Sequence, residues 1–139
     1  MKPTLLSILF LFYSICSFCQ IIGKTTVADL RSELKVDADV EKFDESYKAG
    51  GMLFKVLYKD GDKREFCFYN NLLFCRKVYD KKETAQEKFD KMKNEGLIIQ
   101  DDKIWRLKGF DGSETIAVLV STDDFGRTWL VYLGLPRME

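Results

Sequence analysis

The sequence predicts an α+β fold, an antiparallel sheet with two short helices packed on one face, in the element order α-βββ-α-ββββ. Two observations support this prediction. Two segments whose apolar residues recur at helical spacing are each followed by a series of strand-like segments. The predicted strands are joined by turns of only a few residues, and connections that short require antiparallel neighbours.

Residues 1–19 are typical of a secretory signal peptide, which leaves residues 20–139 as a single α+β domain. Lys2 precedes an apolar run over residues 5–15. Cleavage between Cys19 and Gln20 puts Ser17 and Cys19 where signal peptidase requires small side chains. We therefore expect an exported protein of the periplasm or cell exterior, with no membrane span in the mature chain.

A lipoprotein and an N-terminally anchored protein are the alternatives for this leader. Neither Cys16 nor Cys19 follows the small residue that lipidation of a cysteine requires. Residues 16–20 interrupt the apolar run, whereas a spanning helix needs about twenty apolar residues. A cut after Cys16 also satisfies the size rule, so the cleavage position itself stays open.

The first predicted helix covers residues 24–35. Thr25 or Thr26 can cap it, and Val27, Leu30 and Leu34 fall on one face. The acidic residues 36–48 hold at most a short strand before the break at residues 50–51.

A hairpin follows, with strands at 52–59 and 64–69 around a turn at 60–62. A three-residue loop there places Val56 opposite Phe66 and Phe54 opposite Phe68. This register directs the aromatic face of both strands inward.

Cys67 and Cys75 are the two cysteines that remain after cleavage, and whether they can form a disulfide depends on how the third strand, at 72–79, pairs with the second. A two-residue Asn-Asn loop pairs Cys67 with Phe74 and sends Cys75 to the opposite face. A three-residue loop would put Cys67 across from Cys75, but it would require Leu72 to adopt a left-handed backbone conformation, which is unfavourable for leucine. We expect two buried free thiols, with a Cys67–Cys75 disulfide as the alternative that an oxidising compartment permits.

The second predicted helix opens on a capping box formed by Asp80 and Glu83 and stops at Gly96, with Phe89 and Met92 on its apolar face. Strands are predicted near residues 97–100, 103–108, 115–121 and 128–134.

Composition excludes several classes of function. The chain balances 22 basic against 22 acidic residues, so no basic excess favours nucleic acid. It contains no histidine, which removes Ser-His-Asp and Cys-His mechanisms and histidine-based zinc sites. The acidic pairs do not match a calcium loop. We expect neither a metal nor a cofactor.

One segment, residues 122–129, carries a named motif. Thr122, Asp124, Gly126, Thr128 and Trp129 match Ser/Thr-x-Asp-x-Gly-x-Thr-Trp, and the segment resembles the Asp-box. Asp-boxes occur in sialidase-like propellers and in unrelated secreted proteins, away from the catalytic site. The resemblance implies a hairpin in which the aspartate bonds the turn backbone and the tryptophan packs over it. One copy in a chain of this length is too little for a propeller.

These observations predict a small exported binding or interaction protein of the periplasm or cell exterior. Its partner is a protein or a small apolar ligand held between helix and curved sheet. The sequence favours a non-catalytic role. A carboxylate-based glycan hydrolase, which would need two inward carboxylates about 5 to 9.5 Å apart, and a structural envelope component are the alternatives.

Overall fold

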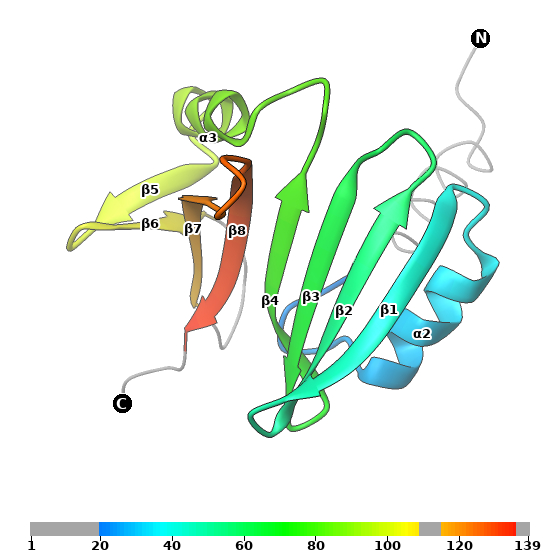
Figure 1. Cartoon of the computed structure of the whole chain (residues 1–139). Helices are drawn as coiled ribbons and strands as arrows, with labels where there is room; N and C mark the ends of the chain where they lie inside the picture. The colour runs from blue at the N-terminus through cyan, green and yellow to red at the C-terminus, as the bar shows by residue number, and fades with distance from the viewer. Residues whose placement is uncertain (1–19, 109–114, 136–139) are drawn as a thin grey trace, which may run out of the picture.

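The computed structural model of the chain describes residues 20–108 and 115–135, and these form one antiparallel sheet and two helices (Figure 1). In chain order the elements are α2 (Val27–Val36), β1 (Val40–Lys48), β2 (Gly51–Tyr58), β3 (Lys63–Tyr69), β4 (Leu72–Tyr79), α3 (Ala85–Asn94), β5 (Ile98–Asp101), β6 (Ile104–Leu107), β7 (Thr115–Thr122) and β8 (Thr128–Leu135). The predicted leader at residues 1–19 lies outside the described residues.

The sheet order is β1-β2-β3-β4-β8-β7-β6-β5, so the chain consists of two halves that meet along β4 and β8. Each half is a helix followed by a meander of four strands, and the strand order from edge to centre is the same in both. In Figure 1, α2 lies beside the β1–β4 half and α3 beside the β5–β8 half. The predicted antiparallel sheet is confirmed.

Both helices begin at a capping box. Thr26 accepts a hydrogen bond from the backbone N–H of Asp29, and the Asp29 carboxylate accepts one from Thr26 N–H. Thr84 and Glu87 make the same exchange at α3. The second helix therefore starts later than the predicted box at Asp80. The Asp80 carboxylate instead pairs with side chains of β3 and α3, as described below.

The buried apolar residues form one cluster for each helix. The α2 cluster joins that helix to β2, β3 and β4 through Leu30, Leu34, Met52, Phe54, Val56, Phe66, Phe68 and Leu73. The α3 cluster joins that helix to β4, β5, β7 and β8 through Val78, Ala85, Ile98, Val118 and Leu130, with Phe89 and Met92 packed against it. Cys75, Trp129 and Val131 form a third cluster, and strand alternation places it on the opposite face from Val78 and Leu130.

The acidic segment before residue 50, which was expected to hold at most a short strand and was left out of the predicted strand order, forms a full strand. All nine residues Val40–Lys48 belong to β1, which pairs with β2 along its length. Most β1 side chains are exposed, so the apolar pattern that marks a half-buried strand is weak there. The observed order is thus α-ββββ-α-ββββ, with one strand more than predicted.

The hairpin between β2 and β3 has a different register from the predicted one. Phe54 lies opposite Phe66 and Val56 opposite Arg64, because Tyr58 N–H already bonds to Asp62 O and closes the turn earlier. The predicted pairing was wrong by two residues. A shift of two leaves every side chain on the same face, so the predicted inward face was correct.

The turn between β3 and β4 does contain two residues, Asn70 and Asn71, both at positive φ (50° and 64°). The predicted partner of Cys67 was nevertheless wrong. A bulge shifts the register between Cys67 and Phe68, and Cys67 pairs with Cys75. Both thiols are free in the structure.

Candidate functional site

A cleft of about 1020 Å³ opens between the C-terminal end of α2, the side of α3 and the central strands of the sheet. Apolar residues from both halves contribute to its walls and floor, and charged residues surround them. Its lining consists of Gln20, Glu33, Leu34, Val36, Asp37, Ala38, Asp39, Tyr58, Lys59, Asp60, Asp62, Arg64, Arg76, Val78, Lys88, Leu130 and Tyr132. This volume lies at the upper end of the range typical of small-molecule sites.

Two arginines on the sheet form the basic part of the cleft. Arg64 and Arg76 occupy inward positions of β3 and β4, since Phe66 pairs with Arg76 and Val78 pairs with Arg64. Arg64 Nη1 donates to Asp80 Oδ1 at 2.7 Å and to the Tyr79 carbonyl oxygen at 3.3 Å. This guanidinium group is therefore held in place by a carboxylate and the backbone.

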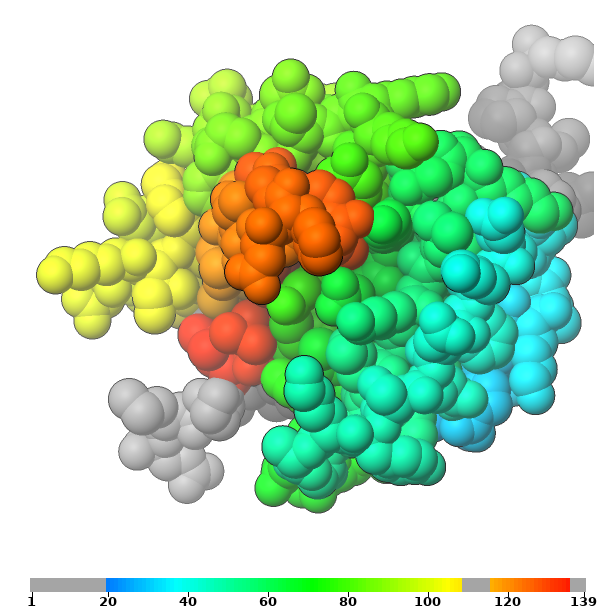
Figure 2. Space-filling model, viewed as in Figure 1, coloured from blue at the N-terminus to red at the C-terminus, as the bar shows by residue number. Residues whose placement is uncertain are grey.

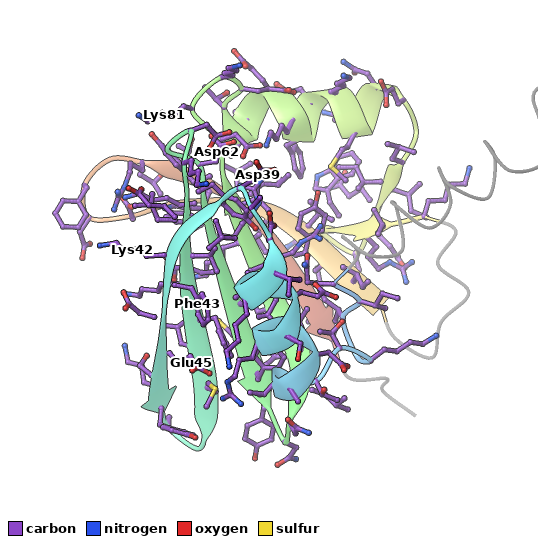
Figure 3. All side chains as sticks on the ribbon, turned by 90° about the vertical axis from the view of Figure 1, so that its right-hand side faces the viewer. Asp39, Lys42, Phe43, Glu45, Asp62 and Lys81 are labelled. Carbon is purple, nitrogen blue, oxygen red and sulfur yellow. The ribbon has the colours of Figure 1, made fainter. Side chains whose placement is uncertain are left out.

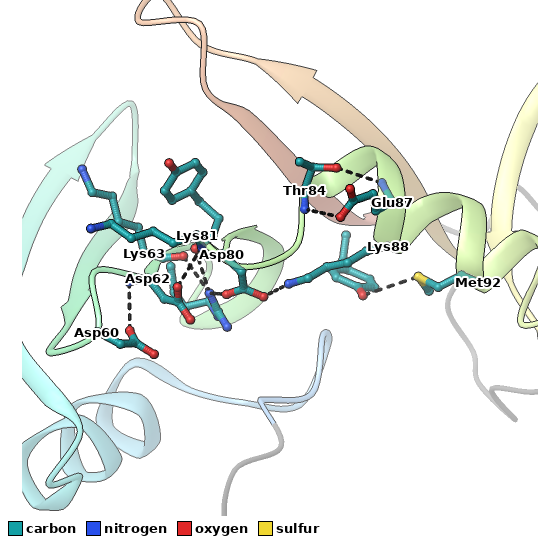
Figure 4. A network of polar contacts seen from close by, with 12 residues as sticks. Asp60, Asp62, Lys63, Asp80, Lys81, Thr84, Glu87, Lys88 and Met92 are labelled. Atoms are coloured by element: carbon teal, nitrogen blue, oxygen red, sulfur yellow. Dashed lines mark hydrogen bonds and ion pairs between the residues drawn. The ribbon is translucent and has the colours of Figure 1, made fainter.

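Asp80 also binds Lys88 of α3 through its second carboxylate oxygen (Figure 4). One carboxylate thus ties β3 to α3 across the cleft. Burial, assisted by the nearby Arg64 and Arg76 charges, lowers the pKa of Lys88.

Arg76 differs from Arg64 because its charge is not paired with any carboxylate of the described residues. Its guanidinium carbon lies 4.5 Å from the ring centroid of Tyr132, its neighbour on β8. Its Nε is enclosed and has no hydrogen-bond partner among the described residues. A half-buried guanidinium group that lies over an aromatic ring and has no carboxylate partner among the described residues can pair with an acceptor that enters the cleft.

The opposite charge gathers at one end of the cleft, where the α2–β1 connection meets the β2–β3 turn. Asp37 and Asp39 come from the connection, and Asp60 and Asp62 come from the turn. Figure 3 shows Asp39 and Asp62 at the same end of the molecule. The Asp37, Asp60 and Asp62 side chains accept backbone N–H groups, which fixes both loops.

Burial perturbs two further groups in the cleft. It raises the pKa of Glu33, whose carboxylate accepts a hydrogen bond from Gln20 Nε2 at 2.9 Å. It also raises the pKa of Tyr58, which stays a neutral phenol with the Arg64 guanidinium carbon 5.5 Å from its ring centroid. The cleft therefore holds a carboxyl group whose pKa lies above that of a free glutamate.

The residues of the predicted Asp-box hairpin lie outside the cleft lining. Thr122 pairs with Thr128 and closes the β7–β8 hairpin, and Gly126 has φ of 78° in the turn. Trp129 is buried and packs on Tyr79, with ring centroids 5.6 Å apart. Figure 2 shows this turn, in orange, standing out from the surface.

The carboxylate that organises this turn is Asp123, and the prediction for Asp124 was wrong. Asp123 Oδ1 accepts the backbone N–H groups of Phe125 and Arg127, both at 2.9 Å. Its Oδ2 accepts from Trp129 Nε1 at 3.0 Å and from Arg127 Nε at 2.9 Å. The Trp129 indole N–H and the Arg127 donors hold the pKa of Asp123 well below its usual range. Asp124 is exposed and makes none of these contacts.

Cys67 and Cys75 also lie outside the cleft. Cys75 is buried, and Cys67 is half-buried beside the Trp129 cluster. A hydrogen bond between the two thiols lowers the pKa of Cys67 and raises that of Cys75. Cys67 is therefore the more acidic of the two thiols.

Within residues 20–108 and 115–135, neither helix is long and apolar enough to cross a membrane. The same residues contain no group of three or more Cys, Asp or Glu side chains that could hold a metal ion.

Sequence reasoning missed the basic floor of the cleft, although a signal for it existed. Arg64 is two residues from Phe66 and therefore shares its inward face in any register of that hairpin. A charged residue on an otherwise apolar strand face is unusual and indicates a polar site. Arg76 gave no such signal, because its inward position depends on the bulge between Cys67 and Phe68.

No family model, curated protein or solved structure matches this chain.

Proposed function

We propose that this chain is an exported, non-catalytic binding protein whose ligand occupies the cleft between α2 and α3. The observation that supports it most is the cleft itself, about 1020 Å³ and lined by both apolar and charged side chains. Ligand sites combine an apolar lining with a few placed polar groups in this way.

We also propose that both helices lie on the same face of the sheet, so that the cleft runs between them. Arg76 supports this placement because it pairs with Phe66 on one side and with Tyr132 on the other. Phe66 belongs to the α2 cluster, and Val78, two residues after Arg76 on the same strand, belongs to the α3 cluster. Residues two apart on a strand share a face.

Export is proposed on the leader-like character of residues 1–19, and cleavage near Cys19 and Gln20 follows from it. Gln20, the proposed first residue of the mature chain, lines the cleft and bonds to Glu33. Intact-mass measurement on protein purified from an exporting bacterial host tests this. A chain that begins at Met1 would contradict cleavage, and an added acyl mass would indicate the lipoprotein.

A small ligand fits this cleft better than a protein partner does. Apolar side chains such as Leu34, Val78 and Leu130 are recessed between the two helices and the sheet. Protein partners more often bind a flat patch with an apolar centre. We therefore propose a small molecule with an apolar part.

Blocking the cleft mouth tests the binding function. Ala38 lines the cleft and is exposed, so Ala38→Trp fills space without entering the core. Ala28→Trp is the matched control, because Ala28 is an exposed alanine of α2 outside the cleft lining. The purified proteins are incubated with a small-molecule extract of the host envelope and measured by native mass spectrometry.

We expect a bound mass on the unmodified protein and on Ala28→Trp, and its loss from Ala38→Trp. Equal capture by both tryptophan variants would place the ligand elsewhere. An unmodified protein that captures nothing from the extract would contradict the function.

Glycan hydrolysis is the second candidate, and the state of Glu33 is the observation that favours it. Glu33 lines the cleft with a raised pKa, as a general acid requires, and Asp37 follows one helical turn later. Release of reducing ends from soluble polysaccharides should then disappear in Glu33→Gln and persist in Glu41→Gln, which changes an exposed β1 residue outside the cleft. Activity that survives Glu33→Gln, or that the unmodified protein lacks, would remove this candidate.

A further inference from the structure

The charge on Arg76 is not balanced within the part of the chain that the structure describes. Arg64 and Lys88 share the Asp80 carboxylate, whereas Arg76 takes part in none of the ion pairs among the described residues. Its Nε is enclosed without an acceptor. A buried, charged donor that lacks an acceptor is costly to the folded state, so such a group is unusual unless something else satisfies it.

Arg106 shows why an enclosed Nε is not sufficient by itself. Its Nε is also enclosed and unpartnered, but its guanidinium group pairs with Asp101 through Nη2, and it does not line the cleft. Arg76 combines three features: the enclosed donor, the missing carboxylate and a position on the cleft floor. The protein itself closes off Nε, so the unpaired charge on the cleft floor, and not this donor, indicates that an anionic ligand group binds the guanidinium group.

We propose that the ligand of this cleft is a monocarboxylate with an apolar body, whose carboxylate binds Arg76. This inference rests on the proposed binding function. The guanidinium fork matches a carboxylate in a two-point hydrogen-bonded pair, and its contact with the Tyr132 ring restricts where that fork lies. The apolar body then lies against the recessed side chains of Val78 and Leu130 beside Arg76 and Tyr132.

The acidic end of the cleft limits the charge that such a ligand carries. Asp37, Asp39, Asp60 and Asp62 line that end, and like charges disfavour a polyanion there. A ligand with a single negative charge at Arg76, and with its uncharged part toward the four aspartates, is compatible with both the basic and the acidic part of the cleft. Phosphorylated ligands with several charges are therefore disfavoured against monocarboxylates.

The probe for this inference is 4-phenylbutyrate, compared with its neutral amide, 4-phenylbutyramide. The two have nearly the same shape and differ in charge, so their affinities separate the carboxylate contact from apolar burial. Protein expressed from the full chain is titrated with each, and ¹H–¹⁵N spectra follow the Arg76 Nε–H signal and the backbone signals of the cleft. We expect the acid to move the Arg76 Nε–H signal and to bind at least about tenfold more tightly than the amide.

Two arginine variants locate the effect. Arg76→Gln should lower the affinity for the acid to that for the amide, while Arg106→Gln, which changes the other arginine with an enclosed Nε, should leave it unchanged. Backbone spectra show whether each variant is folded, and the comparison of acid with amide on the unmodified protein needs no variant.

Equal affinity of the unmodified protein for acid and amide, with cleft signals moving in both titrations, would overturn the carboxylate inference and leave the binding function standing. Absence of any cleft shift up to about 20 mM acid would also overturn it, since the probe carries both proposed features. The capture experiment with the envelope extract then decides the binding function separately.

Discussion

Truncation of Phe54 to alanine should be among the most destabilising single changes in this protein. Its side chain is 0 % exposed and lies between Phe43 and Phe68, with ring centroids 6.3 and 5.5 Å away. Truncating a fully buried phenylalanine costs about 3 to 5 kcal/mol, and loss of two aromatic contacts favours the upper half of that range. We expect the free energy of unfolding to fall by about 4 kcal/mol, a large share of the roughly 5 to 15 kcal/mol typical of a domain.

Urea denaturation followed by tryptophan fluorescence measures this change, provided that the slope of the transition stays constant. Phe125→Ala is the matched control, because Phe125 is 83 % exposed and the truncation is chemically identical. Its effect should stay within about 0.5 kcal/mol. A loss below about 1.5 kcal/mol for Phe54→Ala, or one equal to that of the control, would refute the packing of α2 on β2 and β3.

Three further predictions concern the cap of α3, the thiol pair and the β7–β8 turn. Thr84→Ala should lower the free energy of unfolding by about 1 kcal/mol in urea, because it removes the N-cap, while Thr84→Ser should retain most of the stability. Alkylation of Cys67 by iodoacetamide should reach half its maximal rate at a pH near the pKa of this thiol, about 7. Cys75→Ala should move that midpoint up to about pH 8.5, because the hydrogen bond between the two thiols is lost. Identical midpoints in the two proteins would contradict this hydrogen bond. The depressed pKa of folded Asp123 means that its carboxylate stabilises the fold above its unfolded pKa and loses this effect as the pH falls. Asp123→Asn should therefore lower the melting temperature at pH 7, and its gap from the unmodified protein should narrow below about pH 4, whereas Asp124→Asn should change little at either pH.

Local sequence patterns correctly predicted the helices and strands whose apolar residues are strongly periodic. They failed to predict element boundaries that depend on contacts between residues far apart in the sequence. The helix at Val27–Val36 was predictable because its threonine cap and its apolar spacing agree. The strand Val40–Lys48 was underestimated because its backbone pairing with β2, and not an apolar face, holds it in place. The cap of α3 is Thr84 and not the predicted Asp80, because the Asp80 carboxylate pairs with Arg64 and Lys88. Local sequence spacing does not reveal these two partners.

The same limit applies to the sites. The motif at residues 122–129 predicted a hairpin over which Trp129 packs. It named Asp124 as the aspartate that bonds the turn, whereas its neighbour Asp123 makes those bonds in the structure. A single bulged residue decided the partner of Cys67, and turn composition does not fix the position of a bulge. Arg76 became a candidate binding residue only once that bulge and the β4–β8 pairing were known.

The position of the cleft follows from the way the two halves join. The α2 cluster ends on β4 at Leu73 and the α3 cluster includes Val78 of the same strand, so the two clusters meet at β4, beside its seam with β8. The register at that seam pairs Arg76 with Tyr132 and Val78 with Leu130, and all four side chains line the cleft. Under the proposed binding function, Arg76 is the position in this seam where a substitution should change ligand affinity with the least effect on folding, because it takes part in no ion pair among the described residues.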